Sequence, residues 1–146
     1  MSISYAPMTI SDYDEALALW QETEGMGLHL ADVDSRGGVA RFLQRNPGLS
    51  MVARDGARLV GTVLCGHDGR RGYMNHLAVS AHCRRHGVAR ALLSRCLVAL
   101  RDADIVKCNA FVYSDNATGR NFWEHEGWNL REDLVIMQID IADKIG

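Results

Sequence analysis

Two β-rich runs joined by a tight turn constrain the fold of this chain more than any other feature of its sequence. Residues 49–54 and 58–65 are rich in strand-forming side chains, and the dipeptide Asp55-Gly56 between them favours the turn of a β-hairpin. A longer turn at 66–72 (GHDGRRG) then leads into a third apolar run at 73–79. The sequence therefore predicts three consecutive strands in the middle of the chain.

Helical patterns lie on both sides of these strands. Apolar residues recur at helical spacing from Tyr13 to Trp20, behind a capping-type start at Ser11. Further helices are predicted at 32–45, 87–101 and 116–126, and further strands at 2–7, 105–112 and 134–141. The predicted order is β-α-α-β-β-β-α-β-α-β, so the class is mixed α/β with helices covering a sheet.

The bulk composition predicts one ordinary globular domain that spans residues 1–146. The chain is 47% hydrophobic and 23% charged, and 146 residues leave no room for a second core. A net charge of -2 argues against a general nucleic-acid binder, which needs basic excess to neutralise phosphates. No apolar run reaches the ~20 residues that span a bilayer, and no secretory signal pattern is present, so we expect a cytoplasmic protein without a membrane partner.

The cysteines do not predict a metal site or a disulfide framework. They stand at 65, 83, 96 and 108, without a Cys-x-x-Cys pair or a matching histidine spacing. Cys65, Cys96 and Cys108 lie in apolar segments, so we expect them to be reduced core residues. Cys83 is adjacent to His82, and we expect both residues at the surface of a loop. No metal is predicted.

Charge is distributed unevenly along the chain. The first 34 residues contain no Lys or Arg, and the first basic residue is Arg36. One interpretation is a solvated helix face; the other is a negatively charged rim that attracts a cationic molecule. The acidic residues of this segment are Asp12, Asp14, Glu15, Glu22, Glu24, Asp32 and Asp34.

The stretch 77–89 has the features of an anion-binding site. A strand end, a polar loop and a helix start follow one another, and unpaired N–H groups at a helix N-terminus attract phosphate. Gly87 would let a ligand approach the backbone, and Arg84 and Arg85 add positive charge. The glycine patterns of P-loop and Rossmann nucleotide sites are absent.

Two motifs resemble those of the GCN5-related N-acetyltransferase (GNAT) family. Arg84-x-x-Gly87-x-Ala89, after a strand that ends Leu-Ala-Val, resembles the family's Arg/Gln-x-x-Gly-x-Gly/Ala signature. Residues 116–128 (NATGRNFWEHEGW) resemble Asn-x-x-Ala-x-x-Phe-Tyr-Glu-x-x-Gly-Phe, and 68–72 (DGRRG) resembles a turn of small bacterial members. The resemblance implies a single-domain mixed sheet, mostly antiparallel, with helices on both faces.

The resemblance also implies acetyl-CoA as co-substrate and a set of residues that bind it. The strand backbone at Leu77 and Val79 would pair with the pantetheine arm, and the N–H groups of 84–89 would surround the pyrophosphate. Asn116 would contact the pantetheine, and Phe122 would pack against the arm or the core. The implied cofactor-binding residues are Leu77, Ala78, Val79, Arg84, Arg85, His86, Gly87, Val88, Ala89, Asn116 and Phe122.

The catalytic residues stay unassigned at this stage. Trp123 stands where many relatives have a Tyr that protonates the departing thiolate, and an indole N–H is not a usable acid. Tyr113 is a conceivable replacement or a structural residue. For a general base, the strand 73–79 offers Tyr73, Asn75 and His76; alternatives that would act through water are Glu24, Asp32 and Asp34.

The function implied is acetyl transfer from acetyl-CoA to a primary amine, with a small cationic acceptor favoured by the acidic first segment. A protein N-terminus or lysine is the alternative acceptor. A rival from another class is a non-catalytic acyl-CoA-binding or sensing domain, for which the loss of the usual Tyr is the main argument. A homodimer is left open.

Overall fold

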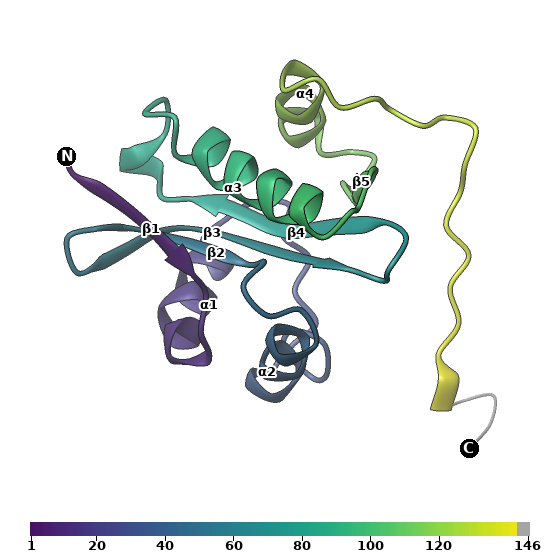
Figure 1. Ribbon diagram of the computed structural model, residues 1–146, viewed down its shortest axis with the longest axis horizontal. Helices are drawn as coiled ribbons and strands as arrows, with labels where there is room; N and C mark the ends of the chain where they lie inside the picture. Colours follow the sequence, from purple (N-terminus) through teal and green to yellow (C-terminus); the bar gives the residue numbers. More distant parts are fainter. Residues whose placement is uncertain (143–146) are drawn as a thin grey trace. The chain divides into compact units, whose positions relative to one another are not determined.

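The structure is a computed structural model that describes residues 1–142. It divides into a first unit, Met1–Tyr113, and a second unit that begins at Ser114. The first unit holds a five-stranded sheet and most of the helices, and the second holds one helix and an extended segment (Figure 1). The assignment of all 146 residues to one domain stays a prediction.

The sheet of the first unit follows the order of the chain. Neighbouring strands in the sheet are antiparallel except for the last pair, which is parallel. The predicted mostly antiparallel mixed sheet is therefore confirmed. The strands, in sheet order, are β1 (Ile3–Pro7), β2 (Met51–Asp55), β3 (Arg58–His67), β4 (Gly72–Val79) and β5 (Cys108–Ala110).

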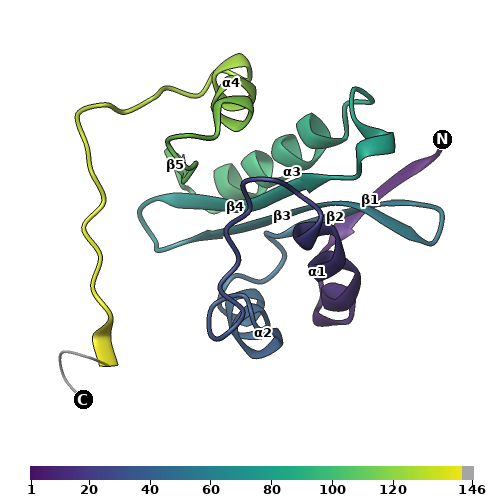
Figure 2. The same ribbon diagram turned by 180° about the vertical axis from the view of Figure 1, so that it is seen from behind.

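Helices cover both faces of this sheet, as predicted. The helices α1 and α2 lie on one face and α3 lies on the other (Figures 1 and 2). Their bounds, with two short 3₁₀ helices, are η1 (Ile10–Asp12), α1 (Tyr13–Gln21), α2 (Arg36–Arg45), η2 (Ala81–Cys83) and α3 (Val88–Asp102). In the part of the chain that the structure describes, none of the helices has the length and apolarity needed to cross a membrane.

The predicted hairpin is present at the predicted turn. Asp55 pairs with Arg58 at the end of β2 and β3, and Gly56 between them has φ = +62°. This left-handed conformation is the one that glycine adopts without steric cost. The turn sets the register only next to it, because Arg54 pairs with Leu59 whereas Ala53 pairs with Gly61, so a bulge shifts the register by one residue further along β3.

The buried faces of α1 and α3 explain why these segments are helical. Ala16, Leu19 and Trp20 recur at helical spacing and are buried between α1 and the sheet. On the other face α3 buries a stripe at the same spacing that contacts β2, β3 and β4. That stripe consists of Val88, Leu92, Leu93, Cys96 and Leu100.

Two predicted helix starts are wrong by a few residues. The capping residue is Thr9, not Ser11: its backbone N–H donates to the Asp12 carboxylate at 2.9 Å, ahead of the short 3₁₀ helix. The second helix begins at Arg36 because the Ser35 hydroxyl accepts from the Gly38 N–H at 3.0 Å and caps it. Residues 32–34 therefore belong to the connection between α1 and α2.

The predicted last strand, 134–141, is wrong. The structure has no strand there, and the large apolar side chains of this segment are each at least 59% exposed. A strand needs a neighbour for its backbone N–H and C=O groups, and the alternating apolar pattern alone does not supply one. The predicted strand at 105–112 shortens to Cys108–Ala110. The second unit contains α4 (Ala117–His125).

Candidate functional site

The strand β4 contains a β-bulge centred on His76. Thr62 and Leu64 of β3 stand opposite Ala78 and Asn75, so one more residue lies between the partners on β4 than on β3. His76 is the inserted residue with positive φ, +53°. Such a backbone conformation is uncommon for a residue other than glycine.

Beyond the bulge, no strand among residues 1–142 pairs with one edge of β4. The pairing with β5 covers only Gly72–Met74, at one end of β4 (Figure 1). The Ser80 N–H donates to the Val60 carbonyl at 2.8 Å, so alternation along the strand directs the backbone groups of Leu77 and Val79 away from β3. These groups are free to pair with an extended ligand that contains amides.

The loop between β4 and α3 is built as an anion cradle. Arg85 and Gly87 have φ = +68° and +76°, and such turns point successive N–H groups to one side. None of the backbone N–H groups from Arg85 to Ala89 donates a hydrogen bond to any residue of 1–142. An added Cβ at Gly87 would meet nothing within 4 Å, so the cradle is open.

The electrostatics of the cradle suit a phosphate group. The side chains of Arg84, Arg85 and His86 are exposed. Within residues 1–142 neither arginine forms an ion pair, so both guanidinium groups are available to an anion. The N-terminus of α3 adds the positive end of a fifteen-residue helix behind them. The Arg84 N–H is engaged by the Ala81 carbonyl at 3.3 Å, so the predicted run of available N–H groups begins at Arg85 and not at Arg84.

On the opposite face of the sheet, His76 is joined to a buried aspartate. Asp34 is 4% exposed, and its Oδ1 lies 2.6 Å from Nε2 of His76. Its Oδ2 accepts from the His29 N–H at 2.8 Å, and its backbone carbonyl accepts from the Tyr13 hydroxyl at 2.6 Å. Burial, and then the charge of Asp34, raises the pKa of Tyr13.

A second set of contacts holds the backbone and the ring of His76. The Trp20 indole N–H donates to the Thr62 hydroxyl at 2.9 Å, and that hydroxyl donates to the His76 carbonyl at 2.9 Å. The Trp20 and His76 rings meet edge to face with centroids 4.8 Å apart. His76 is therefore fixed from α1, from β3 and from the α1–α2 connection.

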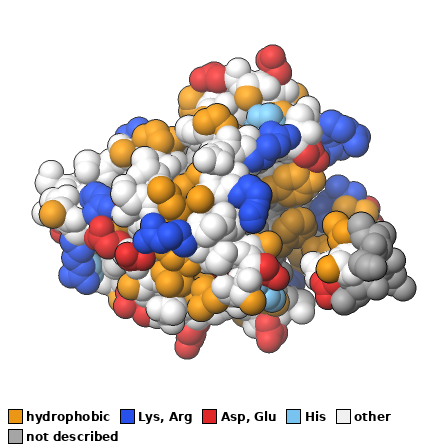
Figure 3. All heavy atoms as spheres, turned by 90° about the horizontal axis from the view of Figure 1, so that it is seen from below, with side chains coloured by type: hydrophobic (Ala, Val, Ile, Leu, Met, Phe, Trp, Pro, Cys, Tyr) orange, Lys and Arg blue, Asp and Glu red, His pale blue; other side chains and the backbone are white. Residues whose placement is uncertain are grey.

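Most of the acidic charge near α1 is neutralised locally. Arg54 lies 2.7 Å from Asp12 and 3.1 Å from Glu15, and Arg36 lies 2.9 Å from Asp14. The hydrogen bond from Arg54 lowers the pKa of Glu15. Figure 3 shows the side that carries α1 and α2, where acidic side chains lie among basic and apolar ones.

Three acidic residues of the α1–α2 connection differ from these. Glu22, Glu24 and Asp32 are exposed, and none of them forms an ion pair within residues 1–142. They share this connection with Asp34, whose carboxylate is paired with His76. Three carboxylates without a basic partner among the described residues, called the free carboxylates below, therefore lie near the His76 side of the sheet; that of Asp32 accepts from the Val33 N–H.

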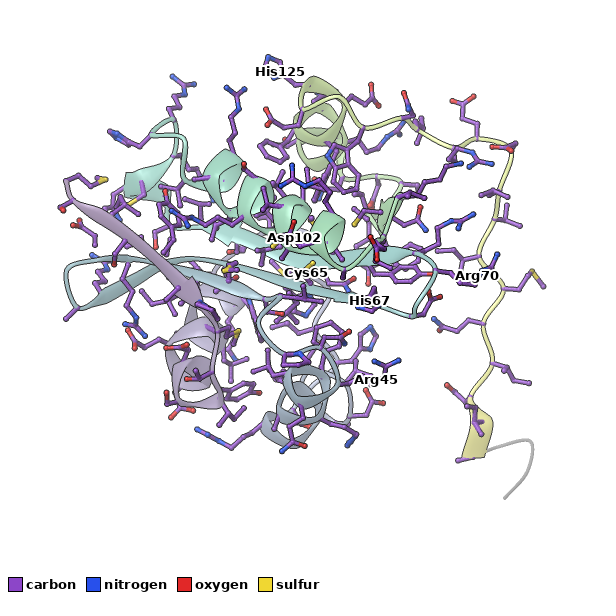
Figure 4. The ribbon with its side chains drawn as sticks, viewed as in Figure 1. Arg45, Cys65, His67, Arg70, Asp102 and His125 are labelled. Atoms are coloured by element: carbon purple, nitrogen blue, oxygen red, sulfur yellow. The ribbon has the colours of Figure 1, made fainter. Side chains whose placement is uncertain are left out.

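The cysteines are structural. Cys65, labelled in Figure 4, is buried on β3 under α3, and a hydrogen bond with Cys96 followed by burial raises its pKa. Burial raises the pKa of Cys108 to about 12. Cys83 is fully buried, so its predicted place at the loop surface is wrong. Among the described residues, no three His, Cys, Asp or Glu side chains are grouped so that they could hold a metal ion.

In the second unit, Asn116 caps α4. Its side-chain oxygen accepts from the Gly119 N–H at 2.9 Å, and a Cβ at 119 would collide with the Asn116 amide, which explains glycine there. Trp123 packs edge to face on Phe122 and Trp128, with centroids 5.7 and 4.6 Å away. The cofactor roles of Asn116 and Phe122 stay predictions.

Tyr113 ends the first unit beside the α1–α2 connection. Its ring lies against Gly27, where an added Cβ would overlap the ring atoms, and the residue is 53% exposed. This contact requires a glycine at 27, which also has φ = +61°.

Comparisons with known proteins agree with this fold. The sequence model of the Acetyltransferase (GNAT) family matches residues 13–128, and the chain belongs to that family. It is an acyl-CoA-dependent N-acetyltransferase by class. It is 28% identical to acetyltransferase SG1711 of Sodalis glossinidius over 126 residues, and this alignment covers 86% of this chain and 87% of the relative. It is 29% identical over 134 residues to acetyltransferase YE1169 of Yersinia enterocolitica, covering 92% and 93%.

Solved structures share the fold at low sequence identity. Ard1 from Thermoplasma volcanium matches with a TM-score of 0.78 at 17% identity, covering 90% of this chain and 85% of that one. The PaiA N-acetyltransferase of Thermoplasma acidophilum, solved in complex with coenzyme A, matches with a TM-score of 0.78 at 16% identity, covering 90% and 92%.

Proposed function

We propose that this chain transfers the acetyl group of acetyl-CoA to the primary amine of a small cationic acceptor. The observation that carries the proposal is the open cradle before α3, where five consecutive N–H groups have no partner within residues 1–142. An N–H cradle at a helix N-terminus, with two unpaired arginines, fits the pyrophosphate of acetyl-CoA.

The free edge of β4 supports the same cofactor. Pantetheine is an extended chain with amide groups, so it can pair with the outward backbone groups of Leu77 and Val79 as an added strand would. The acetyl thioester would then lie near the bulge, and the chain would hold it beside the acceptor amine. Such positioning can contribute roughly 7–11 kcal/mol to lowering the barrier.

The cationic acceptor is supported by the three free carboxylates. Glu22, Glu24 and Asp32 are exposed in the connection that also contains Asp34, on the face of the sheet where His76 projects. Exposed carboxylates without basic partners attract a polycation at moderate salt, and the attraction weakens once the Debye length falls from ~10 Å at 0.1 M to ~3 Å at 1 M.

Gly87 offers a test of the cofactor site with a matched control. Both Asp and Asn tolerate a left-handed backbone, and a side chain at 87 enters open space, so Gly87→Asp and Gly87→Asn differ mainly in charge. Calorimetry should show that Gly87→Asp weakens CoA binding about tenfold or more, about 1.4 kcal/mol, relative to Gly87→Asn. Equal affinity in the two folded variants would remove this loop from the cofactor site.

A panel of amines tests the activity and the acceptor. Release of free CoA from acetyl-CoA should be measured with spermidine, with lysine, with a peptide that has a free N-terminus, and with a neutral amine. Turnover with the polycation should be fastest. If no amine releases CoA from a protein that binds it, the chain is an acyl-CoA-binding domain instead.

Charge-neutralising variants test whether the three free carboxylates bind the cationic acceptor. Neutralising the three free carboxylates should lower kcat/KM for spermidine and flatten its dependence on salt, while CoA affinity stays constant. A second triple variant removes the same charge elsewhere, and it should behave as wild type. Equal kcat/KM for spermidine in the two variants would decide for a plain solvated face. The first set is Glu22→Gln, Glu24→Gln and Asp32→Asn; the control set is Asp55→Asn, Asp102→Asn and Asp104→Asn.

A further inference from the structure

His76 has one ring nitrogen engaged and the other available. Nε2 lies 2.6 Å from the Asp34 carboxylate, and a carboxylate accepts, so neutral His76 carries its proton on Nε2. Nδ1 then holds a lone pair, and within residues 1–142 it makes no hydrogen bond. Since the described residues contain no buried side-chain nitrogen or oxygen without a partner, Nδ1 must touch solvent.

The backbone of His76 has a conformation that is sterically unfavourable for histidine. A histidine at φ = +53° is strained relative to ordinary conformations, and such strain persists where surrounding contacts determine it. Here the contacts come from Asp34 on the ring, Thr62 on the carbonyl and Trp20 on the ring edge. The bulge thus aims one imidazole, with a fixed tautomer, at the face that carries the free carboxylates.

We propose that His76 is the general base of the reaction and that Asp34 is its positioning residue. This inference rests on the proposed function, because it needs an amine acceptor on this face of the sheet. An aliphatic amine with a pKa near 10 is about one part in a thousand unprotonated at pH 7, so a base must accept a proton before the nitrogen can attack. Imidazole is the side chain suited to this near neutral pH.

Two protons leave the acceptor nitrogen during the reaction. The acceptor arrives as R–NH3⁺, and one proton passes to Nδ1 of His76 and from there to water. The nitrogen then forms a bond to the thioester carbonyl carbon, and the carbon–sulfur bond breaks. A second proton leaves the nitrogen as the amide forms and ends on the sulfur of CoA. The Asp34 carboxylate accepts from Nε2 and stabilises the imidazolium while it exists.

The charged groups around His76 are few. The Asp34 carboxylate touches its ring, and the Tyr13 hydroxyl of α1 binds the Asp34 carbonyl. The Arg36 guanidinium of α2 lies 5.3 Å from the Tyr13 ring centroid and is paired with Asp14. From β3 the packing residue is the neutral Thr62, so Asp34 is the charge in direct contact.

Two variants separate a base from a structural histidine. His76→Asn tolerates the left-handed backbone and cannot accept the proton, and its side chain is too short to reach Asp34 in place of Nε2. Asp34→Asn would donate its amide N–H to Nε2, which moves the imidazole proton to Nδ1 and blocks the base. The matched control is His67→Asn, at the end of β3 by the β3–β4 turn, where Nδ1 accepts from the Gly69 N–H (Figure 4).

The measurement is kcat against pH, with spermidine or the most active amine of the panel. Wild type and His67→Asn should reach a plateau near neutral pH. His76→Asn should lose about 10²–10⁴-fold at pH 7 and keep rising with pH through pH 9, because it uses only free amine. Asp34→Asn should show a loss in the same direction, and calorimetry should give wild-type CoA affinity for every variant.

The outcomes distinguish this proposal from the previous one. If folded His76→Asn keeps kcat within about threefold and keeps the plateau, His76 is not the base. If His76→Asn does not fold, Asp34→Asn is the test. A kcat–pH profile of Asp34→Asn equal to that of wild type would refute the proposed roles of both His76 and Asp34. A wild-type protein that binds CoA but acetylates no amine overturns the proposed function, and this inference with it.

Discussion

Replacing Thr62 by Val should destabilise the protein although the two side chains have nearly the same shape. Thr62 and Trp20 are both 0% exposed, and the Thr62 hydroxyl accepts from the indole N–H and donates to the His76 carbonyl. Valine leaves a buried donor unpaired, which costs roughly 1–3 kcal/mol. At about 2–4 °C per kcal/mol, a cost near 2 kcal/mol lowers Tm by roughly 4–8 °C.

The assay is thermal unfolding followed by circular dichroism, with urea titration as a second measure. Thr62→Ser keeps the hydroxyl and is the control. Because the cost arises from an unpaired N–H, Thr62→Val should be cheaper in a Trp20→Phe background by about 1–3 kcal/mol, which a double-mutant cycle measures. A Thr62→Val protein as stable as Thr62→Ser, with no coupling to Trp20, would refute the hydrogen-bond explanation.

Two further predictions follow from the same structure. Trp123→Phe should leave turnover within a few-fold of wild type, because an indole N–H cannot protonate a thiolate; a hundredfold loss at unchanged CoA affinity in single-turnover assays would contradict this. Burial raises the pKa of Cys108 from 9.0 to about 12, so the folded state retains a proton that the unfolded state loses. The contribution of this thiol to stability should be complete below pH 9 and should be lost between pH 9 and pH 12. Urea titrations across that range should show the free energy of unfolding of wild type falling relative to that of Cys108→Ala.

Local signals explain what the sequence could predict. The Asp55-Gly56 turn joins β2 to β3 as predicted, and the apolar stripes of α1 and α3 each lie within one continuous segment. The cradle was predictable for the same reason, because its strand end, arginines, glycine and helix start are consecutive residues. In each case the residues that determine the structure are neighbours in the chain.

Features that depend on distant partners were missed. The 134–141 segment has the alternating apolar pattern of a strand, but the pattern contains no information on which edge would pair with it. Asp34 and His76 are 42 residues apart, and each was only one of several candidates for a base. Their pairing depends on a bulge in β4 and on a cap at Ser35 that ends the α1–α2 connection just after Asp34.

The bulge gives the strongest physical reason to regard His76 as more than a structural residue. A glycine would adopt φ = +53° without a steric penalty, and the Thr62 hydroxyl would still bind its carbonyl. A histidine at this position adds strain, and the ring contacts with Asp34 and Trp20 offset it. Those contacts fix one nitrogen and leave the other exposed to solvent. A purely structural histidine would gain stability from engaging both nitrogens, so the free Nδ1 is the feature that favours chemistry.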